Sequence, residues 1–262
     1  MCTVRKRMRF VVLALTVALV GFGLWYFLVQ EKAANPIYEG KRLSQWIKEL
    51  DSPVLGTSAS ATEAIKAIGI DAIPQLLIEA SAHDSAPKAI AIVLIQKQSF
   101  LKFHIVSGSD HQSRALRGLC ALGTNGAIAV AQGLTNSHTW IRHGCVGQWD
   151  MCTYYPKIVF DPLFDRLRDP EPIIRARAAN ALGMLHQQPE RVVPVLIALL
   201  RDRDDWVRCM AALGLDLYGE PAKPAVPALL VSLTNCSSTF RSFAAPAVKK
   251  LDPQAATEAG IN

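Results

Sequence analysis

The sequence predicts an all-α fold, a solenoid of stacked antiparallel helix pairs. A fixed interval of 33 residues separates four arginines, namely Arg142, Arg175, Arg208 and Arg241. Six residues before each arginine stands a residue typical of turns, and these are Asn136, Asp169, Asp202 and Asn235. Leu134, Leu167, Leu200 and Leu233 keep the same interval, as do small pairs such as Ala178-Ala179. Units of this length that bury their apolar faces only against their neighbours form solenoids.

Composition is consistent with one elongated domain, because half of the 262 residues are hydrophobic. The formal charge is +6, but the first thirty residues contain no acid and four bases, Arg5, Lys6, Arg7 and Arg9. The remaining chain carries 24 bases and 22 acids. Since most of the positive excess belongs to one short flank, we expect no nucleic-acid partner.

Residues 10–29 form an uncharged apolar run, which predicts a transmembrane anchor. As a helix they would be about 30 Å long, the thickness of the hydrocarbon core of a bilayer. Trp25 and Tyr26 suit the far interface. A cleaved signal peptide is the alternative, although the run exceeds a typical signal core and no convincing cleavage site closes it.

The basic flank, residues 1–9, predicts a cytoplasmic N-terminus and an extracytoplasmic repeat domain. Secretion after signal cleavage is the alternative localisation. Such a compartment permits disulfides, yet the six cysteines show no disulfide framework. Buried thiols are therefore favoured, with one or two disulfides as the alternative.

Helical patterns follow one another along the remaining chain. Residues 30–42 are expected to be a linker, 43–250 the solenoid and 251–262 a tail. Leu43, Trp46, Ile47 and Leu50 have the spacing of one apolar helix face, and further patterns follow at 59–69 and 71–80. Residues 81–112 are read as helical but divergent. His104 and His111 lie there without clustered acids or cysteines, which favours structural roles over metal binding.

The later helices are expected at 114–123, 174–183, 192–200 and 225–233. Gly69, Gly123 and Gly183 each follow an apolar residue and are predicted to end a helix. Pro194 and Pro227 are placed in the first turn of their helices, where the missing amide proton has no acceptor.

The repeated polar residues are expected to hold the units together. The Asn and Asp side chains can accept backbone N–H groups at a helix start. Each arginine can reach a turn in its own or an adjoining unit, and its planar donors would fix the register.

These residues resemble HEAT repeats, especially those described as phycobilisome-lyase HEAT-like, most strongly over 161–250. The resemblance implies a right-handed solenoid in which an aspartate-to-arginine ladder is structural. Asp169 with Arg175, and Asp202 with Arg208, fit this ladder, whereas Asn136 and Asn235 lack the carboxylate. Residues 38–53 are similar to the lead-in segment of membrane-anchored bacterial HEAT proteins.

Three classes of function follow. The leading prediction is a membrane-anchored scaffold that binds an unidentified protein or peptide on the extracytoplasmic side, with Trp140 and Trp206 as speculative contacts; packing is the competing role of both.

Some HEAT-like proteins are lyase-related or metal-dependent enzymes. No His-Glu dipeptide occurs here, and His138 and His143 are unfavourably spaced as ligands. We therefore predict no catalytic residue, cofactor or metal. A cytoplasmic nucleic-acid-binding HEAT protein is the third class.

Overall fold

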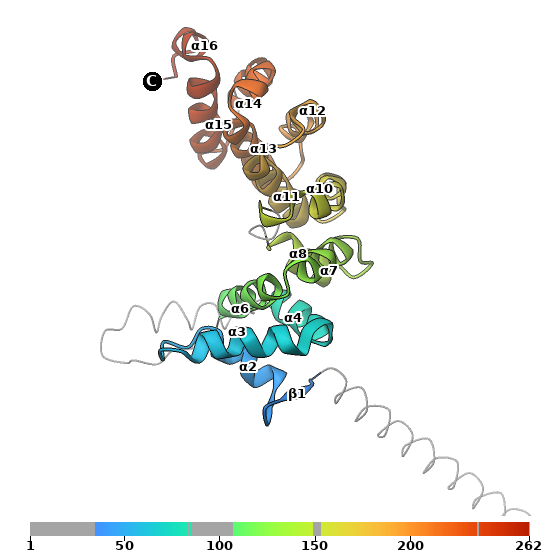
Figure 1. Cartoon of the computed structure of the whole chain (residues 1–262). Helices are drawn as coiled ribbons and strands as arrows, with labels where there is room; N and C mark the ends of the chain where they lie inside the picture. Colours follow the sequence, from blue (N-terminus) through green and yellow to red (C-terminus); the bar gives the residue numbers. More distant parts are fainter. Residues whose placement is uncertain (1–34, 83, 85–106, 149–152, 235, 262) are drawn as a thin grey trace, which may run out of the picture. The chain divides into compact units, whose positions relative to one another are not determined.

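The computed structural model describes residues 35–261, apart from residues 83, 85–106, 149–152 and 235 (Figure 1). Its contacts divide the chain into two compact units, Met1–Gln75 and Leu76–Asn262. The predicted anchor at 10–29 lies outside the described residues, as does most of the divergent segment 81–112. Among the helices that are described, none is long and apolar enough to cross a membrane.

The first unit begins with a small hairpin inside the range expected to be a linker. Strands β1 (Ile37–Tyr38) and β2 (Lys41–Arg42) pair antiparallel, with Ile37 opposite Arg42. Glu39 and Gly40 connect them with positive φ angles of 48° and 76°, as a two-residue hairpin turn requires. Helices α2 (Leu43–Glu49) and α3 (Thr57–Ile68) follow, and then the short 3-10 helix η1 (Gly69–Ala72).

Trp46 joins the hairpin to α2. Its indole nitrogen donates a hydrogen bond to the carbonyl oxygen of Tyr38 at 3.0 Å, and the Lys41 ammonium lies 4.3 Å from the ring centroid. Only 5% of Trp46 is exposed, which agrees with its predicted place on the apolar face of the helix.

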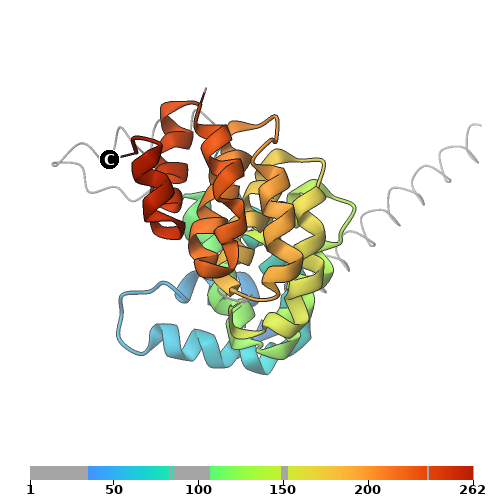
Figure 2. The same cartoon turned by 90° about the horizontal axis from the view of Figure 1, so that it is seen from above.

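Helix α4 (Ile73–Ala80) spans the boundary between the units. In the second unit, helices follow one another in sequence order (Figures 1 and 2). They are α6 (Gly108–Ala121), α7 (Thr124–Leu134), α8 (Thr139–Val146), α10 (Pro156–Asp165), α11 (Pro172–Leu185), α12 (Pro189–Leu199), α13 (Asp205–Tyr218), α14 (Val226–Leu233), α15 (Ser238–Leu251) and α16 (Pro253–Glu258), with 3-10 turns η2 (Arg166–Arg168) and η3 (Glu220–Ala225).

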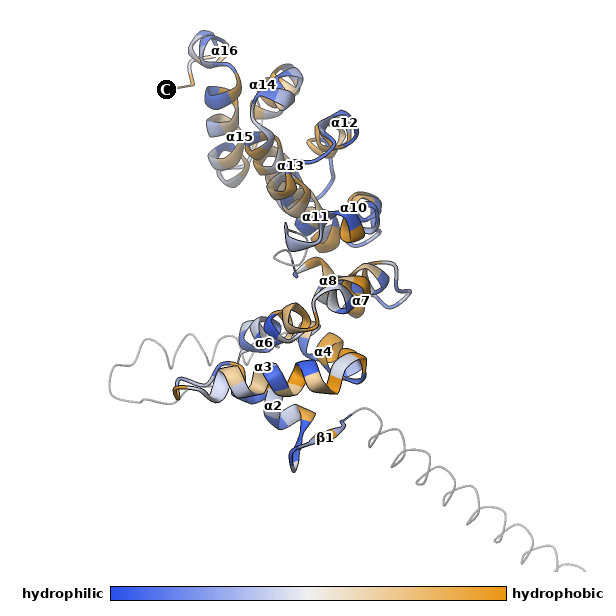
Figure 3. Ribbon diagram, in the orientation of Figure 1, coloured by the Kyte–Doolittle hydropathy of each residue, from blue (hydrophilic) through white to orange (hydrophobic). Residues whose placement is uncertain are grey.

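Helix pairs form the repeating element of this unit. Short connections join α7 to α8, α10 to α11, α12 to α13 and α14 to α15, and the members of each pair pack on one another. The second helices also pack on each other, α8 on α11, α11 on α13 and α13 on α15. Apolar and polar residues both occur along the helices of this unit (Figure 3), and the apolar ones form much of the core. The fold is an all-α helical repeat, as predicted.

Small residues bring the second helices close together. Ala178, Ala179, Ala211, Ala212 and Ala244 are completely buried. Gly183 is also buried, inside α11, so the prediction that it ends a helix is wrong. A Cβ atom added to it would lie 2.7 Å from the Cα atom of Gly214, so Gly183 is required by close packing of α11 on α13. Gly69 and Gly123 do follow helices and have positive φ angles of 68° and 57°.

The helix start at Pro189 corrects the expected position of Pro194. Gln188 has a left-handed backbone with φ of 47°, and Pro189 takes the first helical position that suits proline. Helix α12 therefore begins before Val192, and Pro194 falls in its second turn. Pro227 is the second residue of α14, in the first turn as predicted. The expected tail, 251–262, contains the helix α16.

Candidate functional site

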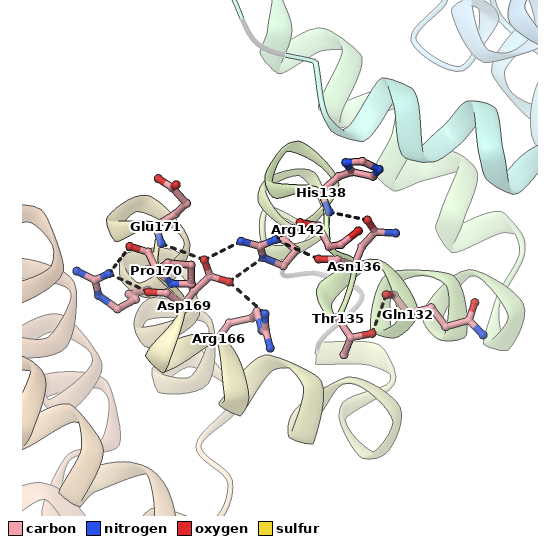
Figure 4. A network of polar contacts seen from close by, with 11 residues as sticks. Gln132, Thr135, Asn136, His138, Arg142, Arg166, Asp169, Pro170 and Glu171 are labelled. Atoms are coloured by element: carbon pink, nitrogen blue, oxygen red, sulfur yellow. Dashed lines mark hydrogen bonds and ion pairs between the residues drawn. The ribbon is translucent and has the colours of Figure 1, made fainter.

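The repeated arginines connect each helix pair to the next one. Arg142, at the start of α8, donates from Nε and Nη2 to the two carboxylate oxygens of Asp169 at 2.8 and 3.1 Å (Figure 4). Its Nη1 donates to the carbonyl oxygens of Asn136 and Ser137 at 3.0 and 2.9 Å. The side chain thus contacts the backbone of its own turn and the carboxylate of the following turn.

Arg175 repeats this arrangement one pair further along. It donates from Nε and Nη2 to Asp202 at 2.9 and 2.8 Å, and from Nη1 to the carbonyl oxygens of Asp169 and Pro170 at 2.8 and 3.0 Å. Such bidentate contacts fix both the distance and the relative orientation of the guanidinium and carboxylate groups. Arg142–Asp169 and Arg175–Asp202 are therefore two equivalent rungs of one ladder.

The ladder changes at Arg208. The side chain still donates to the carbonyl oxygen of Asp202 at 2.8 Å, but its carboxylate partner is Asp205, three residues earlier in α13, at 2.6 Å. Asn235, the equivalent turn residue, lies outside the described residues. Arg241 donates to the carbonyl oxygen of Leu233 at 3.1 Å. Sequence reasoning missed Asp205, although its position one turn before Arg208 on a helix was an available signal.

The turn residues also shape the chain before each second helix. Asn136, Asp169 and Asp202 each accept the amide N–H of the residue two positions later, at 2.9, 3.0 and 2.9 Å. These later residues, His138, Glu171 and Asp204, are the N-caps of α8, α11 and α13. Asparagine and aspartate perform this local role equally well, which explains why the sequence can alternate between them.

Burial determines the electrostatics of the first rung. Arg142 and Asp169 are 6% and 3% exposed. Burial alone would raise the pKa of Asp169, but hydrogen bonds from Arg142 and the Glu171 amide, with the charges of Arg142 and Arg166, lower it overall. The same contact with Asp169 raises the pKa of Arg142 despite its burial. Asp202 has a lowered pKa because Arg175, the Asp204 amide and Arg203 outweigh its burial.

A row of exposed apolar side chains stands beside the ladder. Trp140, Ile173 and Trp206 each occupy the second position of a second helix, two residues before the ladder arginine. They are 47%, 38% and 45% exposed. We call these three residues the apolar row. Thr239 occupies the equivalent position in α15.

A neighbouring ring contacts each of the two tryptophans. His138 stacks beside Trp140 with ring centroids 6.2 Å apart, and Phe243 meets Trp206 edge-on at 6.1 Å. Each tryptophan therefore contacts one neighbouring ring and also presents apolar surface to solvent. Partly exposed tryptophans held in place by neighbours suit binding, because little side-chain freedom remains to be lost.

Two of the cysteines are buried in second helices, and His111 has a polar partner. Cys145 and Cys209 are buried thiols in α8 and α13, and Cys2 and Cys152 lie outside the described residues. Burial raises the pKa of Cys209 to about 11, which leaves the thiol protonated and unreactive at neutral pH. His111 contacts the Glu79 carboxylate on α4.

Comparison with known proteins finds a sequence family that resembles part of the chain. Residues 160–256 match the family described as HEAT repeats, so this segment is similar to HEAT repeats. No curated protein matches the chain.

The solved structures that resemble the chain include engineered and designed proteins. Two engineered proteins are 19% and 17% identical, with TM-scores of 0.46; the matches cover 80% and 83% of this chain and 96% and 100% of theirs. A designed armadillo repeat protein is 15% identical with a TM-score of 0.41, over 80% of this chain and 100% of that one.

Proposed function

We propose that the chain is a membrane-anchored HEAT-like scaffold that binds a protein or peptide partner on the extracytoplasmic side, without catalysis of its own. The apolar row is the observation that carries this proposal. It offers exposed, partly restrained Trp140 and Trp206 from helices that the ladder holds in register. Tryptophan is enriched among the residues that dominate binding energy at protein interfaces.

The anchor and the topology rest on the sequence. The uncharged segment 10–29 has the length of a membrane-spanning helix, and the basic flank favours a cytoplasmic N-terminus. Protease added to intact spheroplasts should therefore digest the repeats while the extreme N-terminus stays protected. Repeats that remain intact while an exposed control protein is digested would contradict this topology.

The binding role of the apolar row can be tested with the full-length protein in its membrane. Proximity labelling identifies neighbouring proteins, and the affinity of each purified neighbour is then measured. Replacing Trp140 and Trp206 with alanine should weaken binding by about 30-fold, the effect of losing one dominant interface residue. Ile128→Ala removes a comparably exposed apolar side chain from α7 and should leave the affinity unchanged. Equal binding by the wild type and the double tryptophan variant would refute the role.

A further inference from the structure

A small cavity lies between α6, α8 and α11 of the second unit. Its volume is about 280 Å³, and it is lined by Gln112, Val146, Gly147, Arg177, Asn180 and Ala181. Arg177 and Asn180 stand three residues apart on α11, which places both on one face of this helix. The equivalents of Arg177 in the other repeats are Gly144, Met210 and Phe243, so its charge does not belong to the repeat pattern.

Arg177 differs from the ladder arginines in its partners. Arg142 and Arg175 each donate hydrogen bonds from two nitrogens to one carboxylate. Among the described residues, Arg177 forms one hydrogen bond, from Nη1 to the carbonyl oxygen of His143 at 3.5 Å, and pairs with no carboxylate. A guanidinium group carries five N–H donors, so most of its donor capacity is available to a ligand.

The described surroundings leave room for this guanidinium group and contain no full negative charge beside it. A Cβ atom on Gly147 would lie 2.9 Å from Nη1 of Arg177, so the glycine makes space for the side chain. The carboxyl end of α8 favours a cation there, but a helix end supplies only partial charge. Burial lowers the pKa of Arg177, and no acid of the described residues opposes the effect. An anionic ligand in the cavity would pair with this charge.

The amides beside Arg177 indicate which anion fits. Gln112 donates from Nε2 to the carbonyl oxygen of Ala82 at 2.9 Å, which fixes its side chain and leaves Oε1 as an acceptor. Asn180 adds a second amide that can donate or accept. A carboxylate on a peptide matches this set, because its oxygens suit the arginine fork while a nearby peptide N–H suits an acceptor. Arg177 is the one cationic side chain among the described lining residues, so its charge balances a carboxylate, whereas a dianionic phosphate would keep an unbalanced negative charge.

We propose that this cavity binds a carboxylate group, an acidic side chain or a chain terminus, presented by the partner. The inference rests on the proposed function, since it names the chemistry of the partner proposed there. Arg177 would bind both carboxylate oxygens, as Arg142 and Arg175 do within the ladder. Asn180 and Gln112 would contact the peptide group beside the carboxylate.

The test uses two small probes on the full-length chain in detergent. N-acetylalanine has a free carboxylate, and N-acetylalaninamide is its uncharged counterpart. Arginine side-chain NMR signals are followed during titration, and the Arg177 signal is identified by its loss in Arg177→Gln. N-acetylalanine should shift this signal to saturation, whereas the amide should not. Arg177→Gln should weaken binding of N-acetylalanine, followed through the backbone amide signal of Asn180, by about tenfold or more.

Control variants separate recognition from net charge and folding. Arg201→Gln removes an exposed arginine with the same charge change, and it should bind N-acetylalanine like the wild type. Arg177→Lys keeps the charge but loses the planar fork, so it should bind more weakly even if Arg177→Gln fails to fold. Equal affinity for both probes, or wild-type affinity in Arg177→Lys, would overturn the inference. Tighter binding of inorganic phosphate than of N-acetylalanine would overturn the choice of a carboxylate.

The carboxylate site and the partner-binding role of the apolar row can fail independently of each other. If N-acetylalanine does not bind while the Trp140 and Trp206 variants lose partner affinity, the carboxylate assignment alone fails. If N-acetylalanine binds at Arg177 while the tryptophan variants keep full partner affinity, the apolar row fails as the partner surface.

Discussion

Asp169 is the most heavily bonded carboxylate of the ladder. It accepts hydrogen bonds from Arg142 and Arg166, and from the amide of Glu171. The Arg166 contact, at 3.1 Å, brings a second positive charge to a side chain that is completely buried. The Asp169 side chain thus connects two helix pairs through Arg142 and also shapes its own turn through the Glu171 amide.

Asp169→Asn tests this dependence. The amide keeps an acceptor but removes the negative charge, which leaves the buried guanidinium of Arg142 without its countercharge. We expect a loss of about 3 kcal/mol in the free energy of unfolding, measured with urea. Asp161→Asn is the matched control, because Asp161 pairs with Arg191 at an exposed site where such contacts contribute under about 1 kcal/mol. Equal losses in the two variants would show that the rung adds nothing beyond a surface ion pair.

At the scale of the helix, the contact between α11 and α13 depends on the absence of side chains. Gly183 faces Gly214, and a Cβ atom on Gly214 would lie 2.9 Å from the carbonyl oxygen of Ala179. Both obstacles are backbone atoms, which cannot turn away as a flexible side chain can. The two glycines therefore set how closely these helices approach.

Gly183→Ala should destabilise the protein although alanine is the better helix former. Intrinsic helix propensity favours alanine by about 1 kcal/mol. Inserting a methyl group into a well-packed core, however, typically lowers the free energy of unfolding by about 1 to 3 kcal/mol. We expect a lower midpoint of thermal unfolding by circular dichroism. Ser242→Ala, on the exposed face of α15, should leave the midpoint nearly unchanged. A higher midpoint for Gly183→Ala would mean that the helices separate without penalty.

At the scale of the whole molecule, the rungs make stability dependent on pH. Asp169 and Asp202 both have a lower pKa in the folded chain than the value of about 3.9 for an unfolded aspartate. Protonation therefore favours the unfolded state. The contribution of the two carboxylates is fully present above about pH 5 and is lost progressively as the pH falls through their folded pKa values.

Thermal unfolding of the wild type and of Asp202→Asn measures this contribution. The wild-type midpoint should fall more steeply between about pH 5 and pH 2, because the variant has already lost one of the two titrating groups. The two curves should converge at the acidic end. Parallel curves over this range would show that Asp202 does not link protonation to folding.

The sequence by itself determined the helical repeat, the residues of the ladder and the apolar helix faces. These properties are periodic, and their period reflects local chemistry: turn residues, helix spacing and small residues at contacts. Helix boundaries were less certain where local signals competed. Gly183 resembles a helix end in sequence, yet packing against Gly214 places it within α11.

Only the tertiary structure decided which groups from different helix pairs meet. Arg142 and Arg175 could have bonded side chains of their own turns, but stacking brings the next aspartate, 27 residues ahead, to each guanidinium group. The same stacking leaves Trp140 and Trp206 half exposed and encloses Arg177 without an acid partner among the described residues. These outcomes depend on distances between helices, and such distances are fixed by packing across pairs, which no local periodicity encodes.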